Sequence, residues 1–167
     1  MIKDIFKDVL RHTHALGFIE MVKITGTEEG TEIEAMDADK TVILKGKLHN
    51  PVADFVDQTV GLSRMSVLDG YLKFPGFGDE GSNVAVNTQE RNGADIPVEI
   101  AFSSAEGHTG SYRFMLADVI NQQLKSVKMK DIPWDVSIQP TQKNLKDLGY
   151  FNGVLGGFEP VFSPSTK

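Results

Sequence analysis

Residues 2–17 read IKDIFKDVLRHTHALG, and this stretch sets the pattern of the chain. Apolar residues stand at positions 2, 5, 6, 9 and 10, the spacing that places them on one side of an α-helix. Lys3, Lys7 and Arg11 are four residues apart and fall along another side. Gly17 is a typical residue just beyond a helix C-terminus. The stretch therefore predicts an amphipathic helix over about residues 2–16 that carries a line of cations.

Short β-type segments separated by turn residues follow this helix. Strands are predicted at residues 18–25, 31–38, 41–48 and 55–60. A second helix is predicted from Ser63, as N-cap, with an apolar stripe of Leu62, Met65, Leu68 and Leu72. Three more strands are predicted at residues 83–88, 96–102 and 112–116. The turns are too short for helical crossovers, so we expect mainly antiparallel pairing and an α+β fold.

The composition changes after residue 117. Residues 118–133 are polar and basic without a clear period, which indicates a connector. A strand at 134–138, a helix from Thr141 to about Leu155 and a strand at 158–162 are expected next. This order repeats the beginning, because Leu16-Gly17-Phe18 after the first helix corresponds to Gly156-Gly157-Phe158 after the third. We therefore predict a first domain at 1–117, a connector at 118–133, and the incomplete start of a similar domain at 134–167.

Composition excludes several classes of protein. The chain has no cysteine, so disulfides and thiolate metal sites are absent, and no apolar run is long enough to predict a membrane span. The N-terminus does not resemble a signal peptide, which favours a cytoplasmic protein. The histidines lack zinc-site spacing, and there is no G-x-S-x-G motif. Residues 76–81 match G-x-G-x-x-G, but they follow a helix and carry two acids, so we interpret them as a loop. The sequence thus predicts a protein that is not an enzyme and has no metal or cofactor.

Cations recur opposite the apolar sides of all three predicted helices. Arg64 lies off the stripe of the second helix, and Lys143 and Lys146 are three residues apart on the third. The chain as a whole is acidic, with a formal net charge of −6. The cations could form an ordinary solvated face with Asp4 and Asp8 as intrahelical partners. They could instead form one basic surface that faces phosphates without reading bases.

The sequence resembles the DNA polymerase sliding clamps, the processivity factors of replication, and in particular those of tailed phages. The resemblance lies in the basic N-terminal helix that passes through Leu16-Gly17-Phe18 into strands, and in the helix 62–72 that follows the strand 55–60. It also lies in the basic connector that leads through residues 134–141 into a helix that restarts the pattern.

This resemblance implies a clamp domain with two helices on one face of antiparallel sheets, plus the start of a second. Such clamps are homo-oligomeric rings, trimers in the phage type, that encircle double-stranded DNA and tether the DNA polymerase, and a clamp loader opens them. Lys3, Lys7, Arg11, Arg64, Lys143 and Lys146 are then the expected DNA-binding residues, with no catalytic residue and no cofactor. A phage-encoded clamp acts in the host cell cytoplasm.

Two other interpretations remain. One is a phage structural or assembly module whose basic helix face binds an acidic surface of another protein. The other is a small-molecule enzyme that uses His108 or the acidic turns, which would require a pocket with convergent polar groups.

Overall fold

The structure, a computed structural model, describes residues 2–48, 50–91, 93–127, 133, 135 and 137–156. Its contacts divide the chain into two compact units, Met1–Val127 and Lys128–Lys167, and each is described by itself. The first unit therefore extends beyond residue 117, where we predicted the first domain to end.

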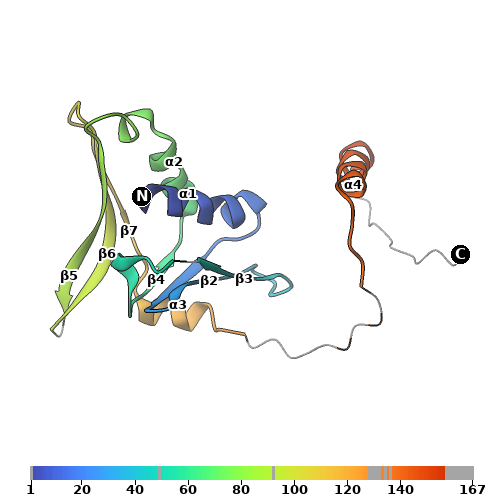
Figure 1. The fold of residues 1–167 in the computed structure, drawn as a ribbon, viewed down its shortest axis with the longest axis horizontal. Coiled ribbons are helices and arrows are strands. Elements are labelled where there is room, and N and C mark those ends of the chain that lie inside the picture. Colours follow the sequence, from blue (N-terminus) through green and yellow to red (C-terminus); the bar gives the residue numbers. More distant parts are fainter. Residues whose placement is uncertain are drawn as a thin grey trace, which may run out of the picture. The chain divides into compact units, whose positions relative to one another are not determined.

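The first unit is mixed α and β, as predicted (Figure 1). Its α-helices are α1 (Ile2–His12), α2 (Met65–Lys73) and α3 (Ala117–Gln123). Its 3₁₀ turns are η1 (His14–Leu16), η2 (Ala53–Phe55) and η3 (Pro75–Phe77). Its strands are β1 (Val22–Thr27), β2 (Gly30–Met36), β3 (Ile43–Leu48), β4 (Thr59–Leu62), β5 (Asn83–Arg91), β6 (Ala94–Ser103) and β7 (Thr109–Arg113).

These strands form two antiparallel sheets, of order β3-β2-β1-β4 and β5-β6-β7. An isolated antiparallel bridge links the first sheet to the segment just after β7, because the backbones of Gly61 in β4 and Met115 exchange hydrogen bonds of 2.9 and 2.8 Å. The antiparallel pairing predicted from the short turns is confirmed.

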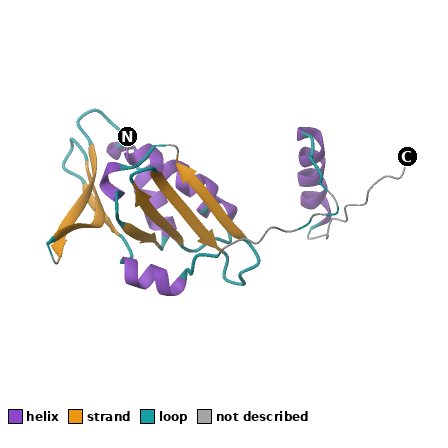
Figure 2. Cartoon of the chain, turned by 60° about the horizontal axis from the view of Figure 1, so that its bottom comes forward, coloured by secondary structure: helices purple, strands orange, loops and turns teal. Residues whose placement is uncertain are grey.

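Helices α1 and α2 pack beside each other on one face of the β1–β4 sheet (Figures 1 and 2). The predicted apolar sides lie in the core: Phe6 of α1, Leu68 of α2 and Val22 of β1 are each fully buried. Burial of a large apolar side chain stabilises the fold by about 1.5–3 kcal/mol. The helix side that faces away from the sheet is therefore the side on which α1 and α2 present charged residues.

Part of the opposite face of this sheet, at β4 and β1, is covered by α3 and the residues after it. Lys23 alternates with Val22 and Ile24 along β1, so its side chain points to that opposite face. There its ammonium contacts Glu34 Oε2 at 2.6 Å and Ser126 Oγ at 2.5 Å.

The helix α3 overlaps the start of residues 118–133, which we predicted to form a connector. Ile120 is fully buried and Leu124 nearly so. Ile120 lies directly above Gly61, where a Cβ atom would come within 2.8 Å of it. Tertiary contact with a glycine of β4 therefore supports a helix too short to be stable alone.

Several boundaries also differ from the predictions. The strand expected at 112–116 runs instead from Thr109 to Arg113. The strand expected at 18–25 begins only at Val22, and Phe18 and Glu20 are exposed before it. The strand expected at 55–60 is displaced, because Phe55 ends the turn η2 and pairing starts at Thr59. Arg64 rather than Ser63 is the N-cap residue of α2.

In the second unit, α4 (Gln142–Leu155) is the predicted third helix. Thr141 caps it with a capping box in which Asn144 takes part, and Gly156 follows in the left-handed conformation with φ 55°. Several apolar side chains of α4 are exposed, including Leu145, Phe151 and Val154. Trp134 and Val136, which belong to the expected strand at 134–138, and the expected strand at 158–162 lie outside the described residues.

Candidate nucleic-acid interface

The exposed groove between α1 and α2 is lined by cations from both helices. Lys7 and Arg11 of α1 are exposed and line a cavity of about 500 Å³ together with Lys73 of α2. His14 and Asp69 also line it, and Leu10 and Leu72 form part of its apolar base. Asp69 Oδ2 accepts from Lys73 Nζ at 2.5 Å, so Lys73 has an intrahelical acid partner. The groove therefore combines Lys7, Arg11 and Lys73 with a single acid among its described lining.

The acid between these cations on α1 points elsewhere. Asp8 lies in a cleft formed with β2 and β3, which Lys47 and Leu48 also line. Its Oδ1 atom is 3.4 Å from His12 Nδ1, one helical turn later. Because Asp8 faces the strand side, it does not neutralise the groove that Lys7 and Arg11 share with α2.

Lys3 does not lie on the exposed line that the sequence predicted. Its side chain is only 8% exposed, and its ammonium donates to the backbone oxygen of Phe77 at 2.7 Å. Burial, and after it the charge of Lys7, hold the pKa of Lys3 below its ordinary value. The prediction of three cations along one exposed side is thus wrong at Lys3, because the turn η3 covers the first turn of α1.

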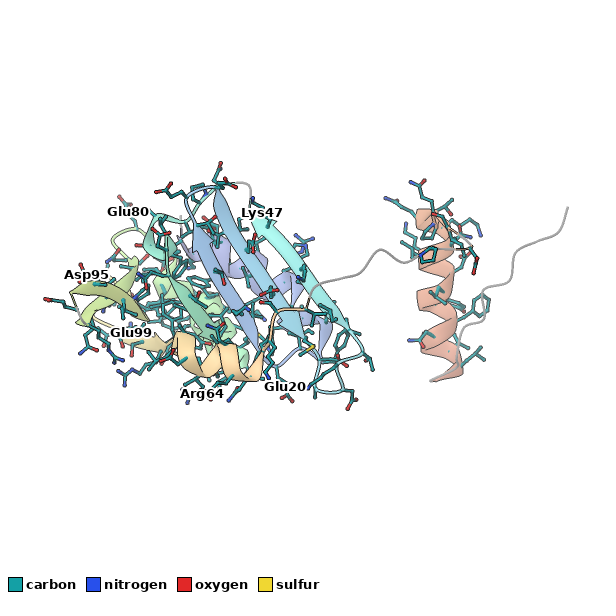
Figure 3. The ribbon with its side chains drawn as sticks, turned by 90° about the horizontal axis from the view of Figure 1, so that it is seen from below. Glu20, Lys47, Arg64, Glu80, Asp95 and Glu99 are labelled. Carbon is teal, nitrogen blue, oxygen red and sulfur yellow. The ribbon has the colours of Figure 1, made fainter. Side chains whose placement is uncertain are left out.

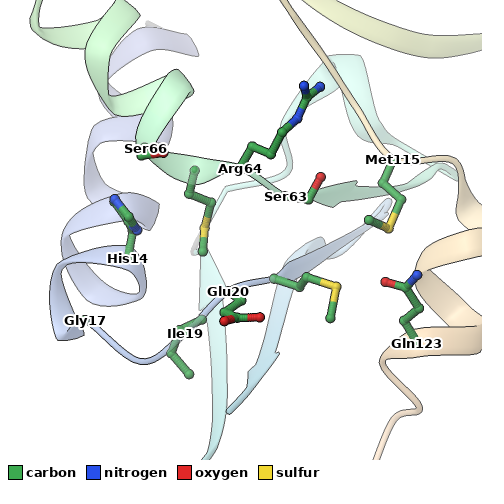
Figure 4. A pocket seen from close by; sticks show the side chains of 11 residues that line it. His14, Gly17, Ile19, Glu20, Ser63, Arg64, Ser66, Met115 and Gln123 are labelled. Carbon is green, nitrogen blue, oxygen red and sulfur yellow. The ribbon is translucent and has the colours of Figure 1, made fainter. Parts of the chain in front are cut away.

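Arg64 is exposed at the start of α2, beside a second cleft of about 530 Å³ (Figure 4). Its backbone is left-handed, with φ 51° and ψ 45°, which is uncommon for a residue with a side chain. The cleft is also lined by Glu20 and, on the side of α3, by Met115 and Gln123.

Tyr112 of β7 fixes the backbone just before Arg64. The Tyr112 hydroxyl donates to the carbonyl oxygen of Ser63 at 2.5 Å and accepts from the Ser63 N–H at 3.0 Å. Burial raises the pKa of Tyr112 to about 12, although the Ser63 backbone and the charge of Arg64 act in the opposite direction. A neutral hydroxyl therefore holds the position from which the Arg64 side chain extends.

Lys143 and Lys146 are exposed on α4, as the sequence predicted. Lys143 Nζ pairs with Asp147 Oδ2 at 2.6 Å, one helical turn later. Both belong to the second unit, whereas the structure brings together the cations of α1 and α2 within the first.

The sequence analysis missed Lys73, which we did not select because it is out of line with Arg64 on α2. The structure explains why this reasoning failed: the relevant neighbour of Lys73 is α1 rather than Arg64. The sequence feature that could have identified Lys73 was its place in the last turn of a helix with a predicted apolar stripe.

Acidic side chains surround the other sheet. Glu80, before β5, and Asp95 and Glu99 of β6 are labelled around the β5–β6–β7 sheet in Figure 3. The α1–α2 groove, with three cations and one acid, differs from the net charge of −6 that the chain carries as a whole.

His108 and the possible metal-ligating residues were two further candidates for a site. Ser104 Oγ and Glu106 Oε2 lie 3.2 and 3.7 Å from the same His108 nitrogen, Nδ1. A Ser–His–acid relay requires the two partners on different ring nitrogens, so this exposed cluster does not have the geometry of a triad. Over the described ranges, no group of three or more His, Asp or Glu side chains could hold a metal ion.

No helix among the described residues is both long and apolar enough to cross a membrane. Comparison with known proteins gives no further constraint, since neither a family model nor a curated protein matches this chain.

Proposed function

We propose that this chain is a subunit of a phage-type sliding clamp, which encircles duplex DNA without sequence specificity and tethers the replicative DNA polymerase. The observation that carries the proposal is the pairing of α1 and α2 on one sheet face, with Lys7, Arg11 and Lys73 lining their exposed groove. Two helices held on a sheet form a rigid wall, and cations along that wall face phosphates rather than base edges.

The charge distribution favours sliding over tight binding. Exposed lysine and arginine side chains contribute phosphate contacts that weaken steeply with salt. Asp69 lowers the net charge of the groove by pairing with Lys73. Acids around β5–β7 disfavour DNA on that side of the first unit. The expected result is weak attraction confined to one surface, with retention on DNA supplied by ring closure.

The proposal carries specific partners. In a clamp, Arg64 and the α4 residues Lys143 and Lys146 add phosphate contacts to those of the groove. The expected partners are duplex DNA, a DNA polymerase, a clamp loader and further copies of the chain in a ring, which is a trimer in the phage type. The protein has no catalytic role of its own and acts in the cytoplasm of the infected cell.

Duplex binding at low salt tests the DNA surface. We expect Lys7→Glu/Arg11→Glu to abolish measurable binding of a fluorescent 30-base-pair duplex in anisotropy titrations. In Lys7→Gln/Arg11→Gln, the slope of log K against log salt should fall in magnitude by about 1.8, near 0.9 per lost contact. The control Lys40→Glu/Lys125→Glu changes the net charge as much as the first variant, at exposed positions away from the groove. Equal loss in that control would show that only total charge matters and would remove the assignment of the groove.

Retention on closed DNA tests encirclement. After chemical cross-linking, a ring should stay on a nicked circular plasmid in high salt and leave the same plasmid once it is cut at one site. Equal release from both forms would contradict encirclement even if the groove binds DNA.

One observation favours the protein-binding alternative. The exposed apolar residues of α4 are typical of a surface that contacts another protein. A structural or assembly module would bind its partner with unchanged affinity after nuclease treatment, and the Lys7→Glu/Arg11→Glu variant would lose that partner rather than DNA.

A further inference from the structure

Lys3 is a buried cation whose hydrogen-bonding capacity is only partly used. A lysine ammonium has three protons, and the hydrogen bond seen for Lys3 is the one to the Phe77 oxygen at 2.7 Å. The acids whose charges act on Lys3 are Asp4 and Asp79. A buried charge that is incompletely paired lowers stability and favours an arrangement that brings a counter-ion to it.

The ammonium lies at a cavity with further donors. Lys3 and Lys7 line a cavity of about 490 Å³ between α1, η3 and the start of β5. Ser82 and Asn83 also line it, and a serine hydroxyl and an asparagine amide are neutral donors. The cavity is within the size range of small-molecule sites. Two cations and two neutral donors from separate segments thus surround one space.

Two acids near this cavity offset the formal charges of its two cations. Asp4 lines the cavity and Asp79 lies close to it, and both charges act to raise the pKa of Lys3. Burial and the charge of Lys7 act in the opposite direction and are larger, so the pKa of Lys3 is lowered overall. An anion bound in the cavity would raise the pKa of Lys3 again.

We infer that the cavity between α1, η3 and β5 binds a phosphate group, with Lys3 and Lys7 as charged donors and Ser82 and Asn83 as neutral ones. A tetrahedral oxyanion accepts hydrogen bonds in several directions, which matches donors that come from α1 and from residues 82–83. The phosphate can belong to a free anion or to a DNA backbone, and the two sources share this chemistry. The inference does not rest on the proposed clamp function, because inorganic phosphate alone tests it.

Gly78 allows the ammonium to be moved without changing the charge. A Cβ atom at Gly78 would lie 3.0 Å from Lys3 Nζ, so Gly78→Ala should displace this flexible end of the side chain. Gly78 has φ −120°, which alanine adopts freely. Gly78→Ala therefore complements Lys3→Gln, which removes the charge, and Lys40→Gln serves as control at an exposed turn.

Inorganic phosphate is titrated at constant ionic strength while the backbone amides of Gly78, Ser82 and Asn83 are followed by NMR. We expect saturable shifts in the unmodified chain, at least tenfold weaker binding in Lys3→Gln, severalfold weaker binding in Gly78→Ala, and a change below twofold in Lys40→Gln. Linear, non-saturating shifts in the unmodified chain, or unchanged affinity in both Lys3→Gln and Gly78→Ala, would overturn the inference.

A second titration with a 12-base-pair duplex separates the two phosphate sources. If the duplex shifts the same three amide signals, and if Gly78→Ala weakens the duplex binding that these shifts report, the site holds a DNA phosphate. Phosphate binding without such shifts would identify a free anion. If the unmodified chain binds inorganic phosphate but no duplex, the clamp proposal fails while the phosphate site stands.

Discussion

Replacing Tyr112 with phenylalanine removes one hydroxyl and leaves two backbone groups of Ser63 without their partner. The Tyr112 side chain is 3% exposed, so water cannot readily replace the lost group. Its hydroxyl is the contact that joins β7 to the junction between β4 and α2. The substitution keeps the ring, and therefore its edge-on contact with Phe114 at 6.3 Å between ring centroids.

The expected loss follows from the two groups left unpaired. Each unsatisfied buried polar group destabilises a protein by about 1–3 kcal/mol. The Ser63 backbone is only partly buried, so we expect a decrease of about 2–3 kcal/mol in the free energy of unfolding. For a unit of this size that corresponds to a fall of roughly 8–12 °C in Tm.

The pH dependence gives an independent check. Because the folded-state pKa of Tyr112 is about 12 and the unfolded one about 10, folding favours the neutral phenol. The stabilisation is fully present below pH 10 and is lost as pH rises through 12. The difference in the free energy of unfolding between the unmodified chain and Tyr112→Phe should therefore shrink as the pH is raised from about 9.5 to about 11.5.

Urea unfolding followed by far-ultraviolet circular dichroism measures these quantities. Tyr71→Phe is the matched control, since the Tyr71 ring stacks on Phe102 at 5.1 Å and its hydroxyl has no hydrogen-bond partner among the described residues. We expect Tyr71→Phe to change stability by about 0.5 kcal/mol or less. A loss in Tyr112→Phe no larger than that, or one that stays constant up to pH 11.5, would refute the bridging role of the hydroxyl.

Three further substitutions test other contacts. Gly26→Ala should destabilise the first unit by about 3 kcal/mol in urea unfolding, because its Cβ would lie 1.8 Å from the Phe55 oxygen; stability within 1 kcal/mol of the unmodified chain would contradict that packing. Burial opposes the ionisation of Glu34, but hydrogen bonds, that of Lys23 foremost, hold its pKa below the ordinary value, so the ionised carboxylate stabilises the fold above about pH 4.5 and this stabilisation is lost as pH falls further. Glu34→Gln should abolish this pH-dependent contribution to the free energy of unfolding. If the stability of the variant falls with acid as steeply as that of the unmodified chain, the contribution is excluded. Thr141→Ala should weaken α4 by about 1 kcal/mol, seen as faster amide exchange in its first turn, whereas equal exchange rates would show that the capping box is dispensable.

Local patterns predicted the elements whose stability is largely local. The first helix follows from apolar residues such as Phe6 and Leu10, and α4 follows from Thr141 and Gly156 at its ends. The short helix α3 was missed because its buried anchor is Ile120, which packs against Gly61, far away in the sequence.

The candidate groove was predictable only in part, for the same physical reason. Periodicity placed Lys7 and Arg11 on an exposed helix side, which the structure confirms. Lys3 shares that period but is buried by Phe77, which is 74 residues away. Lys73 became part of the groove through helix–helix packing, which a single helical wheel does not represent.

The ammonium of Lys23 also determines how β1 can pair with its neighbours. Val22 and Ile24 point into the apolar core, while Lys23 between them meets Glu34 and Ser126 on the other face. Since successive residues of a strand alternate between faces, a shift of one residue would move a charged ammonium into the core and expose an isoleucine to an acid. A misaligned sheet would thus carry an unpaired buried charge, and this one lysine discriminates against every odd register that β1 could adopt.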